Sequence, residues 1–142
     1  MSDCSAHRVP RARLDPITDS ATALTLIRLA AADPPQPQTI VVTLDQRRCG
    51  LHLAVVNRTN ADDDVIDVIE RLLDGVEPLI DIDAMVVASV RPGDQGGHLD
   101  DADRWLHLDE IAESFGVELV EWFVLGRAVS CPRELIGDPE RW

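Results

Sequence analysis

Hydrophobic and polar residues alternate along this chain with two different periods, and each period predicts a different element. Over 65–73, Val65, Ile69 and Leu72 recur at helical spacing, with Glu70 among the polar residues of the opposite face. Short β-branched and apolar runs predict strands instead. The predicted helices cover 21–32, 65–73 and 101–115, and the predicted strands cover 40–44, 51–56, 84–90, 117–125 and 128–131.

The ends of the predicted helices carry residues suited to those positions. Ser20 is a suitable N-cap for the first helix, and Gly75 and Gly116 are suitable ends for the second and third. In the third helix, Trp105 and Phe115 belong to the apolar face that we expect to pack in the core.

The order of these elements predicts an α/β fold, an α+β mixed sheet with helices on its faces. The short connection at 45–50 makes the first two strands an antiparallel hairpin. A chain of 142 residues fits one domain, which we place at 15–142. Residues 1–14 are small, polar and basic, and we expect a disordered basic tail there.

The charge of the chain narrows the function classes. Thirteen basic residues against 26 acidic ones give a net charge of −13, so binding to a nucleic-acid backbone is disfavoured. No apolar run reaches the length of a membrane span, and the N-terminus lacks the apolar segment of a secretory signal. We therefore expect a cytoplasmic protein without a membrane partner.

The three cysteines form no Cys-x-x-Cys pair, which excludes a zinc ribbon and favours reduced thiols. Cys49 follows Arg47 and Arg48 in the hairpin turn, but strand alternation places His52 on the opposite face, so a thiol nucleophile lacks its base. Cys131 is interpreted as a packed core thiol.

The tryptophans invite a binding interpretation, which we weigh against packing. Trp105 is expected in the core, and Trp122 in either the core or an interface. Trp142 is expected to be exposed and to mark a docking surface.

The loop after the strand at 84–90 is the first place to look for a site, because α/β folds bind ligands where strands end. Ser89 and Arg91 lie at this end, and Asp94 follows. Arg91 could bind an anion, but we favour an ion pair between Arg91 and either Asp94 or Asp101. The expected pocket therefore comprises Arg91, Asp94, His98 and Asp101.

A second cluster suggests metal chemistry. His98 and Asp101 are three residues apart, and Asp103 and His107 are four apart on the predicted helix. Carboxylate and imidazole groups together suit zinc, manganese or iron. The simpler interpretation is an acidic helix start, because carboxylates there stabilise the helix dipole. A metal-dependent hydrolase using His98, Asp101, Asp103 and His107 remains the alternative.

The second half of the chain resembles the RadC-like branch of the JAB/MPN (JAMM) metalloprotease-type domains. That family has a strand ending in His-x-His-Pro-Ser-Gly, then an Asp at a helix start, a Gly after the helix, a strand, and a Ser-x-Arg-Glu segment. Here Ser89-Val90-Arg91-Pro92-Gly93 follows the strand, Asp101 starts the helix, Gly116 ends it, and Ser130-Cys131-Pro132-Arg133-Glu134 closes the motif with one extra residue.

The resemblance covers about residues 20–137 and implies a JAB/MPN-like, cytidine-deaminase-like three-layer architecture. It also implies a zinc site of two His and one Asp with a Glu base, but the His positions are Ser89 and Arg91. The Glu position falls near Pro37, and residues 34–44 contain no acid. Serine is a poor zinc ligand and arginine repels the metal, so only Asp101 matches.

These departures predict a catalytically inactive relative with no metal and no cofactor. Domains of this family commonly pair with one another, and inactive members act as partners of other proteins. The resemblance therefore implies an interaction module that binds a protein partner, forms a homodimer, or holds a small ligand in the vacated pocket.

Overall fold

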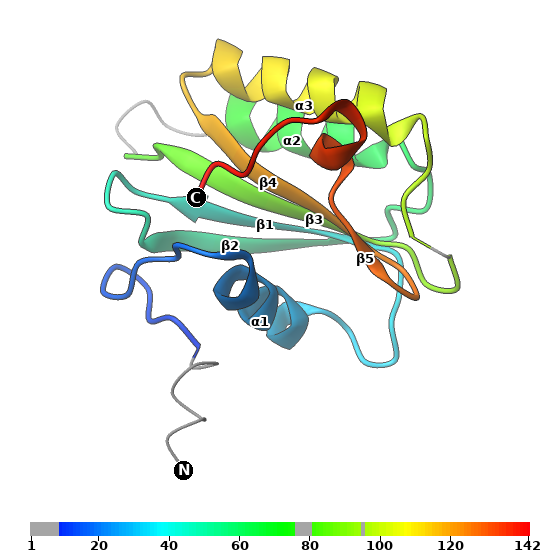
Figure 1. Ribbon diagram of the computed structural model, residues 1–142. Helices are drawn as coiled ribbons and strands as arrows, with labels where there is room; N and C mark the ends of the chain where they lie inside the picture. The colour runs from blue at the N-terminus through cyan, green and yellow to red at the C-terminus, as the bar shows by residue number, and fades with distance from the viewer. Residues whose placement is uncertain (1–8, 76–80, 95) are drawn as a thin grey trace.

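Five strands form one mixed sheet in the order β2-β1-β3-β4-β5 in the computed structural model, which describes residues 9–75, 81–94 and 96–142 (Figure 1). β3 and β4 are parallel, and the other neighbouring pairs are antiparallel. The strands are β1 (Gln38–Leu44), β2 (Gly50–Asn57), β3 (Ala84–Val90), β4 (Glu118–Leu125) and β5 (Val129–Ser130).

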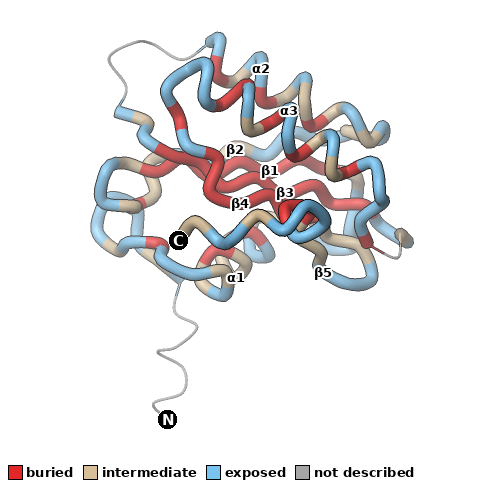
Figure 2. Tube along the Cα trace, turned by 45° about the horizontal axis from the view of Figure 1, so that its top comes forward, coloured by how far each residue is buried: buried red, intermediate tan, exposed pale blue. Residues whose placement is uncertain are grey.

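The helices lie on both faces of this sheet, as expected for the predicted α/β class. They are α1 (Ser20–Ala30), α2 (Asp64–Asp74) and α3 (Asp101–Ser114), followed by the short 3-10 helix η2 (Pro132–Ile136). In Figure 1, α1 covers one face and α2 and α3 cover the other. The central strands β1 and β3 are buried along their whole length (Figure 2), which explains why their sequences are mostly apolar and do not alternate between apolar and polar residues.

Two hydrophobic cores result, one on each face of the sheet. The core beneath α2 and α3 contains Trp105 and Trp122, and the core beneath α1 contains Ile27 and Phe123. A bulge in β4 leaves Val120 without a partner in β3. Because one extra residue shifts the strand alternation, Leu119 and Trp122 face the same core although they are three residues apart.

Most predicted elements are confirmed, and β3 has the predicted bounds. Two details are wrong. The first helix is capped by Asp19, whose carboxylate accepts a hydrogen bond from the Thr22 N–H at 2.8 Å, and Ser20 is already the first helical residue. Phe115 is exposed, because α3 ends at Ser114 and its cap residue no longer follows the helical spacing.

Part of the predicted tail lies against the hairpin. Residues 1–8 lie outside the described residues, but residues 9–14 have defined contacts. The Arg13 N–H donates to the Gly50 carbonyl at 2.9 Å, and Pro16 forms a bridge with Cys49. Arg11 and Asp15 form an ion pair at 2.8 Å. These residues therefore belong to the fold rather than extending away from it.

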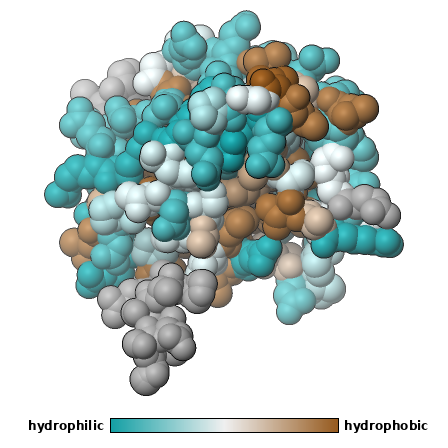
Figure 3. Space-filling view, viewed as in Figure 1, coloured by the Kyte–Doolittle hydropathy of each residue, from teal (hydrophilic) through white to brown (hydrophobic). Residues whose placement is uncertain are grey.

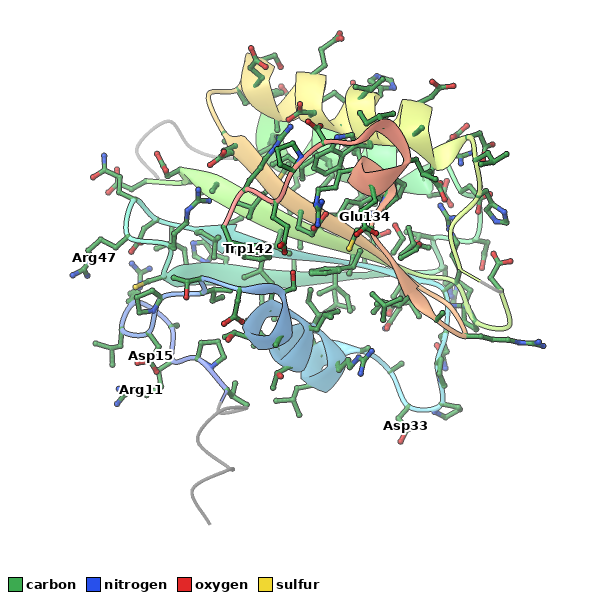
Figure 4. All side chains as sticks on the ribbon, in the orientation of Figure 1. Arg11, Asp15, Asp33, Arg47, Glu134 and Trp142 are labelled. Carbon is green, nitrogen blue, oxygen red and sulfur yellow. The ribbon has the colours of Figure 1, made fainter. Side chains whose placement is uncertain are left out.

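The C-terminal residues cover the edge of β4 that β5 leaves unpaired. The Arg141 guanidinium donates to the Leu119 carbonyl at 3.0 Å. Trp142, labelled in Figure 4, is half-buried against the α1 side of the sheet, and its indole N–H donates to the Ser20 hydroxyl at 3.0 Å. The prediction that Trp142 is exposed for docking is wrong, because the side chain packs on its own chain.

None of the helices in the described part of the chain is both long and apolar enough to span a membrane.

Candidate functional site

The loop that follows β3 is held in place by the turn between β4 and β5. The Arg91 N–H donates to the Leu125 carbonyl at 2.8 Å, and the Arg127 N–H donates to the Asp94 carbonyl at 2.7 Å. A side chain at Gly126 would place its Cβ 2.6 Å from the Asp94 carbonyl oxygen. Only glycine permits this close approach, so the loop is fixed by backbone geometry.

Arg91 and Asp101 form a bidentate ion pair at the base of the site. Two guanidinium nitrogens donate to the two carboxylate oxygens at 2.8 and 2.9 Å. The Asp101 carboxylate is completely buried, and the Arg91 side chain is 9% exposed. This planar, two-bond geometry is the strongest way for a protein to pair these groups. The predicted pairing of Arg91 with Asp101 is thus seen in the structure.

Asp101 has two further donors, which complete its hydrogen bonding. The His98 backbone N–H donates at 2.7 Å and the Arg104 guanidinium donates at 2.8 Å. Burial acts to raise the pKa of Asp101, but the bonds from Arg91, His98 and Arg104 outweigh it, so the pKa lies below its ordinary value. Asp101 is therefore a charged carboxylate whose four acceptor sites are filled.

Gly97 lets the loop pass over this ion pair. A Cβ at Gly97 would lie 2.7 Å from the Ser130 hydroxyl and 3.3 Å from an Asp101 oxygen. Ser130 belongs to the segment near the C-terminus that the family resemblance matches to Ser-x-Arg-Glu. The glycine therefore brings that segment next to the start of α3.

Ser89 and Trp122 form a second buried contact beside the ion pair. The Trp122 indole N–H donates to the Ser89 hydroxyl at 3.0 Å, and the Trp122 side chain is completely buried. The Arg91 guanidinium lies over the same indole ring, 5.9 Å from its centroid. Of the two alternatives for Trp122, the structure shows core packing.

A small cleft of about 140 Å³ opens next to these groups. It lies between the end of β3, the start of β1 and the segment before α2. Hydroxyl, amide and carboxylate groups from these three places contribute to its wall. The residues that line it are Pro37, Thr39, Thr59, Asn60, Ala61, Asp62, Val65, Ser89, Val90, Arg91, Pro92 and Asp94.

The mouth of this cleft carries a charged network. Arg91 Nε lies 3.4 Å from Asp62, so each side of the guanidinium faces a carboxylate. His98 Nε2 lies 3.2 Å from Asp94 and 3.9 Å from Asp62. The structure thus joins Arg91, Asp94, His98 and Asp101 in one hydrogen-bonded network, but of these four residues only Arg91 and Asp94 line the cleft. Sequence reasoning missed Asp62, which also lines it. Since Arg91 is already paired, the mouth favours a cationic or hydrogen-bond-donating group over an anion.

The four residues of the predicted metal cluster do not converge. Asp101 is buried against arginines, and the His98 imidazole faces Asp94. Asp103 and His107 are exposed and line a groove between α2 and α3. Within residues 9–75, 81–94 and 96–142, no three side chains of His, Cys, Asp or Glu lie close enough together to hold a metal ion.

A second buried ion pair, between Glu121 and Arg133, was not predicted from the sequence. Arg133 Nε donates to the Glu121 carboxylate at 2.7 Å, and Glu121 is completely buried. Burial raises the pKa of Glu121, and the bonds from Arg133 and Trp122 only partly offset this. An acidic residue inside the apolar run at 117–125 was the signal that could have revealed it.

The two cysteines in the described residues, Cys49 and Cys131, show no arrangement for nucleophilic chemistry. Cys49 is buried in the hairpin turn. Burial, with the nearby Glu121 and Glu134 carboxylates, raises the pKa of Cys131 to about 12, so its thiol stays protonated at neutral pH. A structural role therefore fits Cys131 better than a reactive one.

Comparison with known protein families and with curated proteins finds no match to this chain.

Proposed function

We propose that this chain is a catalytically inactive, JAB/MPN-like domain that works by binding rather than by hydrolysis. The observation that carries the proposal is the Arg91–Asp101 ion pair. The one acidic residue that matches a metal ligand of the family is bonded to an arginine at a histidine position, 2.8 and 2.9 Å away. The pair neutralises the carboxylate that a zinc ion would otherwise need.

The residues present do not fit a zinc ion. The Ser89 hydroxyl accepts the Trp122 indole N–H, Arg91 is a fixed cation, and the acceptor sites of Asp101 are filled. Pro37 lies in the cleft wall where the resemblance places the general base. A hydrolase of this class needs three metal ligands with an open fourth position and a base beside them, whereas here only Asp101 matches a ligand and the base position falls near Pro37.

The architecture supports the same family-level proposal. A mixed sheet between α1 on one side and α2 and α3 on the other is consistent with a cytidine-deaminase-like three-layer fold. The acidic mouth of the cleft suits a small cationic group or a basic side chain of a partner protein. The charge of −13 makes a nucleic acid an unfavourable partner, and a reduced, cytoplasmic setting is consistent with the free thiols.

Metal content tests this proposal. Elemental analysis of the protein purified without chelator, and again after incubation with zinc, is expected to find almost no metal. About one zinc, iron or manganese ion per chain would overturn it and favour the metal-dependent hydrolase instead.

A restored variant tests the resemblance itself. Combining Ser89→His and Arg91→His with Trp122→Ala returns both histidines and opens the space that the indole fills. We expect this variant to bind zinc through the two histidines and Asp101. The matched control adds Asp101→Asn and should lose the metal. A variant that is folded by circular dichroism yet binds no zinc would count against the resemblance.

A further inference from the structure

Strand β2 is an outer edge of the sheet and lacks the charges that usually protect such edges. Among the strands of the described residues, it pairs with β1 alone. Its sequence, Gly50–Asn57, contains no acidic residue, lysine, arginine or proline. Leu53, Val55 and Val56 are 40%, 37% and 36% exposed. An uncovered apolar edge strand is a template for pairing with another strand.

The open part of this edge begins after the first residues of β2. The N-terminal segment covers Gly50, through the bond from the Arg13 N–H. The His52 N–H donates to the Thr43 hydroxyl in β1 at 3.0 Å and therefore points into the sheet. Because backbone groups alternate along an antiparallel strand, those of Leu53 and Val55 point outward. Their N–H groups can donate hydrogen bonds to an added strand, and their carbonyl oxygens can accept them.

Each face of this edge is hollowed beside an exposed apolar side chain. On the α1 side, Leu53 lines a hollow with Ile17 and Leu26. On the α2 side, Val56 lines a hollow with Val68 and Leu72. An added strand sends alternate side chains to the two faces of the sheet, so an apolar strand would fill both hollows.

Charged residues beside the hollow on the α2 side indicate which partner can supply the added strand. Asp64, Asp67 and Arg71 of α2 line it, and so does Arg58, which directly follows β2, so the acids and bases beside the hollow balance. In the described structure, Asp67 and Arg71 form no salt bridge with any other residue. The acids precede Val68 in the helix and the base follows it. If a second copy of α2 packs antiparallel to the first and crosses it near Val68, the base of each helix therefore lies opposite the acids of the other.

We propose that the open edge of β2 binds the β2 edge of a second copy of this chain, forming a symmetric dimer with one continuous sheet. A two-fold axis perpendicular to the sheet makes the strands antiparallel and preserves their faces, so apolar side chains meet apolar side chains. The same axis makes the two α2 helices antiparallel. With the axis near Val68, it places Arg71 between Asp64 and Asp67 of the partner subunit. The strands themselves carry no acidic residue, lysine or arginine, so they meet without repulsion despite the net charge of −13.

This inference rests on the proposed binding role but not on the cleft or on the absence of metal. Sedimentation equilibrium of the full chain should show a dimer. Arg71→Asp should raise the dissociation constant about tenfold or more, because like charges then face each other across the axis. Asp67→Arg alone should do the same, and the double charge exchange should restore the dimer. Glu113→Arg on the distant α3 is the control and should change nothing.

Val55→Lys directly tests the proposed seam, the contact between the β2 strands of two copies. It puts a charge on the open edge of β2 and leaves the core intact. It should give a folded monomer. A monomeric wild type, or a dimer that ignores both Val55→Lys and the charge exchange, would overturn the proposed seam. Neither result alters the metal content, so failure of the dimer can be distinguished from failure of the proposed function.

Discussion

Two buried arginine–carboxylate pairs lie in the described part of this domain, and they differ in how many N–H donors surround each carboxylate. Asp101 accepts four N–H donors, two from Arg91 and one each from Arg104 and the His98 backbone. Glu121 accepts two N–H donors, from Arg133 and the Trp122 backbone. Both carboxylates are completely buried.

The difference shows in the direction of the two pKa shifts. Burial acts to raise the pKa of both groups, but for Asp101 the donors outweigh burial and the pKa falls. For Glu121 burial outweighs the donors and the pKa rises. A carboxylate can thus be buried as an anion when enough donors surround it, and the arginine at residue 91 contributes half of those around Asp101.

The largest expected effect comes from removing Arg91. Arg91→Met should lower the free energy of unfolding by about 3–5 kcal/mol, because it leaves Asp101 buried without its main partner. Urea denaturation measures this. The matched control, Arg91→Met with Asp101→Leu, removes both charges and should recover most of the loss. A single variant as stable as wild type would show that Asp101 does not depend on Arg91.

Neutralising each carboxylate in turn should lower the free energy of unfolding by different amounts for the two ion pairs. Asp101→Asn should cost about 2 kcal/mol, since it removes charge-assisted bonds and turns one acceptor into a donor that faces arginine. Glu121→Gln should cost less, about 1 kcal/mol, because burial already disfavours the charge it removes and Arg133 keeps its bond to the Asp138 carbonyl. Urea denaturation of both variants at neutral pH checks the order. Equal losses would contradict the comparison.

A smaller effect is expected at the hydroxyl beside the ion pair. Ser89→Ala should cost about 1–2 kcal/mol, because the buried Trp122 N–H loses its acceptor. In a Trp122→Phe background the same substitution should cost much less, since no donor remains. A double-mutant cycle measured by denaturation gives the coupling, and a coupling of zero would mean that the hydrogen bond contributes nothing.

The smallest effect is a difference in pH dependence. The depressed pKa of Asp101 contributes stability above its unfolded value of about 3.9, and this is lost as pH falls toward the folded pKa. The raised pKa of Glu121 has the opposite sign. Its contribution is present below about 4.3 and is lost as pH rises through the folded pKa.

Stability curves between pH 3 and 7, compared with Asp101→Asn and Glu121→Gln, should therefore slope in opposite directions. The stability of wild type relative to Asp101→Asn should fall as the solution is acidified. Relative to Glu121→Gln it should rise. Two slopes of the same sign would mean that both carboxylates are buried in the same way.

The sequence predicted the first pair more readily than the second, for physical reasons. Asp101 lies ten residues after Arg91, and the strand, loop and helix between them could be read from local patterns. Glu121 and Arg133 are brought together by the bulge at Val120 and by the segment that covers the edge of β4. The bulge and the path of the C-terminal segment both depend on tertiary contacts, which the local spacing of apolar and polar residues does not reveal.

The same limit explains the smaller errors. Asp19 and Ser20 are both good N-caps, and only the backbone path distinguishes them. Trp142 is the last residue and is expected from the sequence to be exposed, whereas its indole bonds to Ser20, more than a hundred residues away. Asp62, at the mouth of the cleft, lies in a polar, acidic loop whose sequence does not single it out, and only the tertiary fold brings it to Arg91.

The stability of the wild-type protein with and without metal tests the central claim most directly, because a ligand that binds the native state must stabilise it. Thermal unfolding should be measured in EDTA and then with increasing zinc and manganese. If the Arg91–Asp101 ion pair replaces a metal, the melting temperature should be the same in every condition. A melting temperature that rises with metal concentration and falls in EDTA would contradict the account.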